Sequence, residues 1–249
     1  GDLHINTSDA TLASAAYVSN IESKATTQSI TNDFDNNGAR PGPANSLKGG
    51  AIAPDIGADE VDLAYSGDNI WIGNTSTDWT NAANWSIGVP NSTRNAVIPD
   101  GTTFDPVTIG TNSAKNVIIG LGSSLTVTTT LSIAGVITNA GTFNAENGTI
   151  ELNGTAAQTI SGSTFTNRAI NNLVISNAAG VNVSSTLNDT LNITGSISFG
   201  NVNNAVLNTG DNITLRSTAS ATARIADVTN AGANSGDTII GKATVERFL

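Results

Sequence analysis

A short acidic string near the start of the chain has the residue types of a cation-binding loop. It reads Asp33-Phe34-Asp35-Asn36-Asn37-Gly38, so side-chain oxygens recur at Asp33, Asp35 and Asn37 ahead of a glycine. Alternating oxygen ligands followed by a glycine turn are typical of the start of a calcium loop. The twelfth position holds Ala44, where an EF-hand carries a glutamate. Calcium at Asp33, Asp35 and Asn37 is therefore one interpretation, and an Asx-rich turn that caps backbone amides is the favoured one.

The three tryptophans of the chain, Trp71, Trp79 and Trp85, lie within one stretch of fifteen residues. Exposed indole rings could form a platform that stacks on sugar rings and so binds glycans. Alternatively, the rings could close the end of a stacked β structure, where apolar core and strand edges would otherwise be bare. The cap is the favoured interpretation, because repeat arrays require capping units.

Residues suited to acid–base or nucleophilic catalysis are sparse. The chain has one histidine, His4, and no cysteine, so neither a Ser-His-Asp triad nor a thiol nucleophile is indicated. Glu146 and Glu151 are the acid pair closest to a glycosidase pattern. We expect both to lie in polar surroundings on either side of a turn at Gly148. The sequence therefore predicts no catalytic residues and no cofactor, apart from the candidate calcium ion.

The composition limits the classes of partner. The net charge is −10, only 12% of the residues are charged, and the ten Lys and Arg residues are scattered. This pattern predicts no binding to nucleic acid, which requires a basic surface. No apolar run approaches the 18 residues of a membrane-spanning helix, so we predict no membrane insertion. Aromatic residues make up 4% of the chain, which favours a core of small aliphatic side chains.

The stretch from Asn116 to Leu215 supplies the elements that would position any site. Val, Ile, Leu and Thr alternate in short runs that Gly and Asn interrupt, as in Leu131-Ser132-Ile133 and Leu191-Asn192-Ile193. Period-two alternation with turn residues predicts short β-strands. Coils of about 20–25 residues, each with two or three strands, fit the repeat range of stacked units. Residues 108–249 would then hold about six coils in a rod about 30 Å long.

The predicted fold class is all-β: a parallel β-helix or β-solenoid, with asparagine and threonine ladders at its turns. A β-sandwich is the alternative, but it would have longer strands and larger core aromatics. We predict three regions. Residues 1–62 are the C-terminal end of an upstream parallel β-helix domain, and residues 63–107 are a linker and a tryptophan-rich cap module. Residues 108–249 are the β-solenoid, which we expect to be truncated at its C-terminal end.

Several strings resemble those of secreted and surface β-solenoid proteins of Bacteroidota. Asp33, Asp35, Arg40, Pro41 and the string Asp55-Ile56-Gly57-Ala58-Asp59-Glu60 resemble the last coil of a right-handed parallel β-helix. The spacing of Trp71, Gly73, Trp79, Trp85 and Pro90 resembles the module that precedes such solenoids. The string Gly241-Lys242-Ala243-Thr244-Val245-Glu246-Arg247-Phe248 is similar to a strand found in substrates of type IX secretion. In this family, Asp-Thr-Leu and Asp-Thr-Ile strings imply O-glycosylation, here at Thr190 and Thr238.

The resemblance implies an extracellular or cell-surface location. Together with the predicted rod, it predicts a structural or adhesive segment of a large bacterial surface protein that acts as a rigid stalk. Its expected partners are extracellular glycans or other surface proteins. The alternative is a part of a glycan-binding or polysaccharide-degrading protein whose active site lies outside this stretch.

Overall fold

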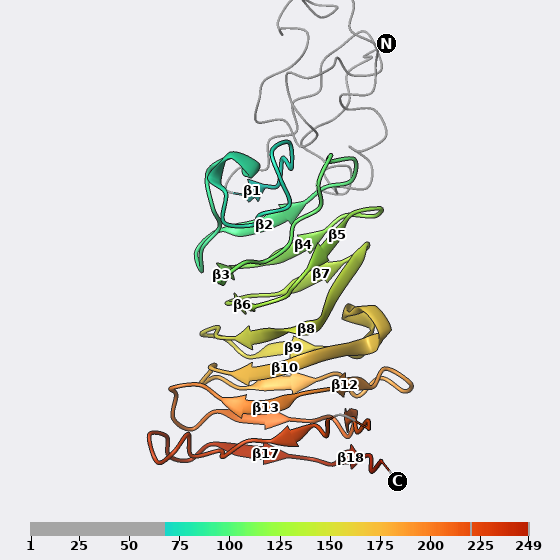
Figure 1. Ribbon diagram of the computed structural model, residues 1–249. Helices are drawn as coiled ribbons and strands as arrows, with labels where there is room; N and C mark the ends of the chain where they lie inside the picture. The colour runs from blue at the N-terminus through green and yellow to red at the C-terminus, as the bar shows by residue number, and fades with distance from the viewer. Residues whose placement is uncertain (1–67, 220, 249) are drawn as a thin grey trace, which may run out of the picture.

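The computed structural model describes residues 68–219 and 221–248. They form a parallel β-solenoid, in which the strands of successive turns stack into a rod (Figure 1). The predicted fold class is confirmed, and the β-sandwich alternative is wrong, because neighbouring strands such as β6 and β8 run parallel. Antiparallel contacts among the described residues are limited to isolated bridges, Trp71 to Trp85 and Ser217 to Thr222.

The first wall of the rod carries one strand per turn in two consecutive runs. The run nearer the start contains β1 (Asp68–Ile70), β2 (Asn95–Ile98), β4 (Val117–Ile119) and β7 (Ile137–Asn139). The second run contains β9 (Gln158–Ile160), β11 (Val181–Val183), β14 (Val206–Asn208) and β17 (Thr238–Ile240).

The second and third walls share two long strands, β8 (Thr142–Leu152) and β10 (Ala169–Ile175), which bend around the corner between them. The first part of β8 pairs with β5 (Ser124–Thr126), and its last part pairs with β6 (Thr130–Ile133). The second wall continues through β12 (Leu191–Ile193), β15 (Ile213–Leu215) and β18 (Ala243–Val245). The third wall starts at β3 (Thr111–Ala114) and continues to β13 (Ser196–Phe199) and β16 (Arg224–Ile225). A full turn therefore has three strand segments.

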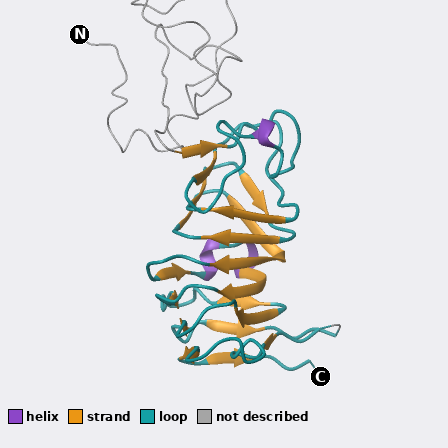
Figure 2. Ribbon diagram, turned by 90° about the vertical axis from the view of Figure 1, so that its left-hand side faces the viewer, coloured by secondary structure: helices purple, strands orange, loops and turns teal. Residues whose placement is uncertain are grey.

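The register gives the length of each turn. Thr130 pairs with Thr149, Val117 with Ile137 and Leu173 with Ile197, which corresponds to turns of 19, 20 and 24 residues. The prediction of 20–25 residues is thus correct to within one residue for these turns. The last turn is longer, because Val206 pairs with Thr238 and loops project between these strands (Figure 2). Seven strands follow one another from β3 to β18 on the longest path, so about six turns are stacked, as predicted.

The core is a set of aliphatic columns inside the three walls. Leu131, Ile150, Leu173 and Ile197 are direct neighbours in register and are almost completely buried. Alternate residues along each strand point inward, so a short strand contributes one or two side chains to the core. The tilted pair Phe143 and Phe165, with ring centroids 4.9 Å apart, is the main aromatic contact in the middle of the rod. The predicted small aliphatic core is therefore confirmed.

The first wall changes character between β7 and β9. Two short 3-10 helices, η2 (Gly162–Thr164) and η3 (Thr166–Arg168), lie in this turn (Figure 2). The buried Gln158 amide connects the two runs, since its Nε2 donates to the carbonyls of Ile133 (2.9 Å) and Gly135 (2.8 Å). Its Oε1 accepts from Gly154 N and from Asn177 Nδ2. The rod is therefore continuous across the break in the wall.

The predicted boundary at residue 107 is not a break in the structure. β1 and β2, from the tryptophan-rich module, pair in parallel with each other, and β2 pairs with β4 of the solenoid. The module thus supplies the first described turns of the rod. The predicted upstream β-helix end, residues 1–62, lies outside the described residues.

Candidate functional site

The tryptophan cluster is the most concentrated group of large side chains in the described part of the chain. Trp85 lies between the other two indoles: its ring centroid is 5.0 Å from that of Trp71 and 4.7 Å from that of Trp79. Both pairs are edge-to-face, with interplanar angles of 79° and 72°. This arrangement places the electropositive ring edge against the electron-rich face of its neighbour.

The loops around the cluster are held by hydrogen bonds to the indoles and to one buried asparagine. Trp85 Nε1 donates to the carbonyl of Trp79 at 2.7 Å, and Trp71 Nε1 donates to the carbonyl of Phe104 at 2.6 Å. The Asn84 amide is fully buried at the end of η1 (Ala82–Asn84). Its Oδ1 accepts from Thr75 N and Ser76 N, and its Nδ2 donates to Asp78 O. The loops are therefore folded around the rings.

Burial decides between the two interpretations of the tryptophans. The exposed fractions of Trp71, Trp79 and Trp85 are 0%, 0% and 3%, and all three belong to the same core cluster as Ala96 and Ile98. A sugar-stacking platform needs an exposed ring face, and none of these rings has one. The platform interpretation is therefore wrong for this conformation. The rings fill the interior of the first described turns, as the cap interpretation requires.

The two glutamates considered for glycosidic chemistry both lie in β8, and the turn predicted at Gly148 is wrong. Gly148 is inside the strand, where a Cβ atom would approach the Val127 carbonyl oxygen to 2.4 Å. Glu146 accepts a hydrogen bond from Asn167 Nδ2. Glu151 accepts from the hydroxyls of Ser132 and Ser176, in the turns before and after it. The absence of catalytic residues in this chain stays a prediction.

Side-chain ladders run along the rod at several corners, as the sequence predicted. Asn116 Nδ2 donates to Asn95 Oδ1 at 2.7 Å, and Asn95 Nδ2 donates in turn to Asp68 Oδ1. Asn116 Oδ1 accepts from Val136 N at 2.7 Å in the next turn. On the third wall, Asn172 connects Thr149 with Ser196 in the same way. Each ladder fastens a turn to its neighbours in addition to the backbone bonds.

The remaining predicted sites differ in whether the structure describes them. Asp33, Asp35 and Asn37, the candidate calcium ligands, lie outside the described residues. Within residues 68–219 and 221–248, no group of three His, Cys, Asp or Glu side chains could hold a metal ion. Thr238 is exposed in β17, whereas Thr190 is partly buried beside Asp189, which accepts hydrogen bonds from Ser163. O-glycosylation at either threonine stays a prediction.

Comparison with known proteins adds no further assignment. No protein-family model matches the chain, no curated protein matches it, and no solved structure matches it. None of the described helices is long and apolar enough to cross a membrane.

Proposed function

We propose that this chain is a rigid structural or adhesive segment, a stalk, of a large bacterial cell-surface or secreted protein. The observation that carries the proposal is the unbroken stacking of parallel strands over about six turns. Strand pairs of one turn continue directly into the next, from β3 through β18. A rod of this type transmits force and keeps its length, because each turn is bonded to the turns on both sides.

The rod has no need of covalent crosslinks. The chain contains no cysteine. Backbone hydrogen bonds between turns, the aliphatic columns and the side-chain ladders act along its whole described length. Buried amides such as Gln158 and Asn177 have partners for their donors, so these polar groups stabilise the corners where they lie. These features support a spacer that resists unfolding and proteolysis.

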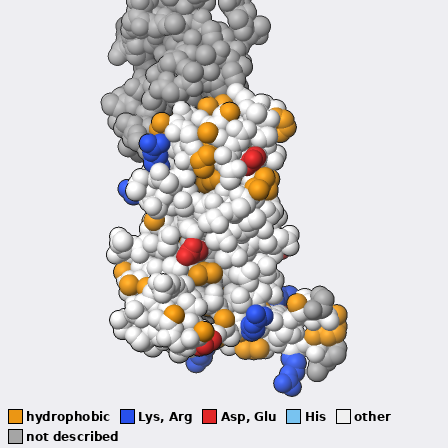
Figure 3. Space-filling model, turned by 60° about the vertical axis from the view of Figure 1, so that its left-hand side comes forward, with side chains coloured by type: hydrophobic (Ala, Val, Ile, Leu, Met, Phe, Trp, Pro, Cys, Tyr) orange, Lys and Arg blue, Asp and Glu red, His pale blue; other side chains and the backbone are white. Residues whose placement is uncertain are grey.

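The extracellular setting is part of the proposal and rests on the resemblance of the sequence strings. The Asp55–Glu60 string, the tryptophan spacing and the Gly241–Phe248 string resemble surface proteins of Bacteroidota that use type IX secretion. Glycans or other surface proteins would be the partners in that setting. The face in Figure 3 carries few charged side chains, which suits contact with neutral partners.

The face of the rod best suited to adhesion is the outer side of the third wall. Its outward row contains Thr111, Thr130, Thr149, Asn172 and Ser196, with successive members in adjacent turns. These side chains are short, polar and uncharged, and they are spaced by about 4.8 Å, the distance between stacked strands. A flat array of this kind offers repeated hydrogen-bonding groups to an extended, uncharged polymer. The buried tryptophans cannot supply this surface.

Two measurements on the chain test the proposal. Under trypsin, a stalk should retain an intact fragment that spans Asp68 to Leu215, although this span contains Arg94, Lys115 and Arg168. Rapid cleavage at these three residues in the absence of denaturant would overturn the proposed rigidity. A glycan array then separates the two roles. Binding that is lost in Thr130→Lys but kept in Leu187→Lys, which changes a loop residue, identifies an adhesive face; no binding identifies a plain spacer.

A further inference from the structure

The end of the rod farthest from the tryptophan cluster leaves inward-facing apolar side chains exposed. Val245 lies in register below Leu215, and Ile225 lies in register below Ile197. Leu215 and Ile197 are 5% and 1% exposed, whereas Val245 and Ile225 are 64% and 42% exposed. β18, β17 and β16 are the last strands of their walls (Figure 1). Hydrophobic and basic side chains are visible together at this end of the rod (Figure 3).

The hydrogen-bonding direction of β18 is fixed by its pairing with β15. Glu246 N donates to the carbonyl of Leu215, and Thr244 pairs with Thr214. Bonding groups alternate sides along a strand, so the N–H and C=O groups of Ala243 and Val245 point away from β15. β18 therefore presents donors and acceptors from the same two residues whose side chains face the interior of the rod.

We propose that β18 pairs with β18 of a second copy of this chain, antiparallel and tail to tail, around a two-fold axis at Thr244. In this register Ala243 lies opposite Val245 of the partner subunit. Both residues have their N–H and C=O groups on the free edge, so they form hydrogen-bonded pairs. Thr244 lies opposite itself as a non-hydrogen-bonded pair, which agrees with its bonding groups facing β15. The same contact covers the two exposed inward-facing side chains of β18.

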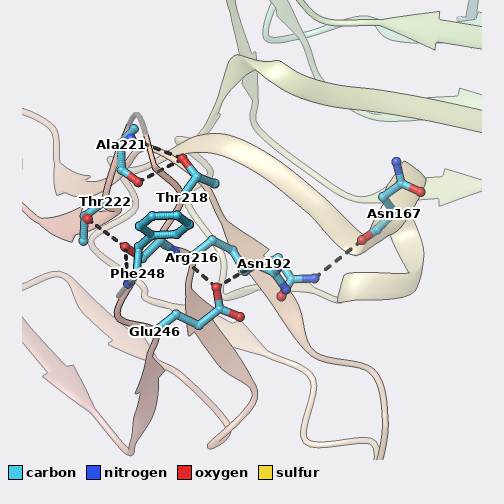
Figure 4. A network of polar contacts seen from close by, with 9 residues as sticks. Asn167, Asn192, Arg216, Thr218, Ala221, Thr222, Glu246 and Phe248 are labelled. Carbon is cyan, nitrogen blue, oxygen red and sulfur yellow. Dashed lines mark hydrogen bonds and ion pairs between the residues drawn. The ribbon is translucent and has the colours of Figure 1, made fainter.

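Charge complementarity supports a second copy as the occupant. In the proposed register the exposed Lys242 lies opposite Glu246 of the partner subunit, and the symmetry repeats this pair. Arg216 Nε holds Glu246 Oε2 at 3.1 Å, and Ser217 N donates to the same oxygen at 3.2 Å (Figure 4). This leaves Glu246 Oε1 for the lysine. Phe248 is held beside this network by a bond from its N to Ser217 Oγ at 3.2 Å. An isologous interface requires such self-complementarity.

A single cysteine at the proposed axis tests the pairing directly. The chain has no cysteine of its own, so Thr244→Cys introduces one thiol per chain. Non-hydrogen-bonded antiparallel pairs have Cα atoms about 4.5 Å apart, within the range that a disulfide bridges. We expect mild oxidation of T244C to give a disulfide-linked dimer in high yield. The matched control, Thr214→Cys on β15, would place its thiols about 14 Å apart and should stay monomeric. Equal crosslinking of both variants, or of neither, would overturn the proposal.

A charge exchange tests the register independently of any thiol. Lys242→Glu places glutamates opposite each other twice in a homodimer, and Glu246→Lys does the same with lysines. We expect each variant alone to sediment as a monomer at a concentration where the unaltered chain is dimeric. An equimolar mixture should dimerise again, because both cross-strand pairs then have opposite charges. A monomeric unaltered chain, or a mixture that does not dimerise, would show that another occupant covers this end.

Discussion

Replacing single tryptophans by phenylalanine tests how the cap is built. Trp79→Phe and Trp85→Phe remove the same ring atoms from sites that are 0% and 3% exposed, so the costs of the lost volume are similar. The hydrogen bonds differ. Trp85 Nε1 donates to the Trp79 carbonyl, whereas Trp79 Nε1 has no hydrogen-bond partner within the described part of the chain.

The difference between the two variants follows from these bonds. Trp85→Phe leaves the Trp79 carbonyl without its donor, and a buried unpaired group costs about 1–3 kcal/mol. Trp79→Phe instead removes a buried unpaired donor, which offsets part of its cavity cost by a similar amount. Trp85 also contacts both other indoles. We therefore expect Trp85→Phe to lower the free energy of unfolding by about 2–4 kcal/mol more than Trp79→Phe.

Urea unfolding followed by far-ultraviolet circular dichroism measures this difference, because the signal reports the strands rather than the altered indole. The transition midpoints should rank unaltered chain, then Trp79→Phe, then Trp85→Phe. A Trp79→Phe midpoint equal to or below that of Trp85→Phe would refute the hydrogen-bond argument. Loss of glycan binding in both variants without any change in midpoint would refute the cap itself.

Three further predictions concern the core, the loops and one carboxyl group. Leu131→Ala, in a fully buried aliphatic column, should cost about 2–5 kcal/mol in the same assay, whereas Leu187→Ala, at a site that is 85% exposed, should change stability by less than about 0.5 kcal/mol. Gly73→Ala should be more destabilising than Gly88→Ala; both glycines have positive φ, but only at Gly73 does a Cβ meet Phe104 O (2.4 Å) and Trp71 Nε1 (2.5 Å). The side-chain and backbone hydrogen bonds from Thr229 hold the pKa of Asp227 below 3.8, so its stabilising effect should be complete above that pH and fade as the pH falls through the lowered pKa; Thr229→Ala should return the NMR-measured pKa towards 3.8.

Much of the fold could be predicted because its signals are local. The alternation in Leu131-Ser132-Ile133 shows directly which side chains point inward, and the structure buries Leu131 and Ile133. Each turn contacts only its neighbours, so the repeat length follows from the spacing of similar strings. The side-chain ladders were predictable for the same reason, since asparagine and threonine recur at the corners.

Features that depend on contacts between turns were harder to predict. Gly148 was expected in a turn, yet it lies within β8, where the backbone bends and closely approaches Val127. A glycine inside an alternating run does signal such a close approach, but the residue it meets is not visible in the sequence. The burial of Trp71, Trp79 and Trp85 likewise depends on β2 and the loop at Phe104 folding over them. The exposed end at Val245 follows from register alone.

The distance between two labels on the third wall tests the central claim, a rigid rod of stacked turns, most directly. Thr111 and Arg224 are exposed and lie in the same outward row, five turns apart. The cysteine-free chain allows spin labels at T111C and R224C. The claim predicts a narrow distance distribution by pulsed electron paramagnetic resonance, set by a backbone separation of about 24 Å and the label arms. A broad distribution, or one centred far from this separation, would contradict a rigid solenoid.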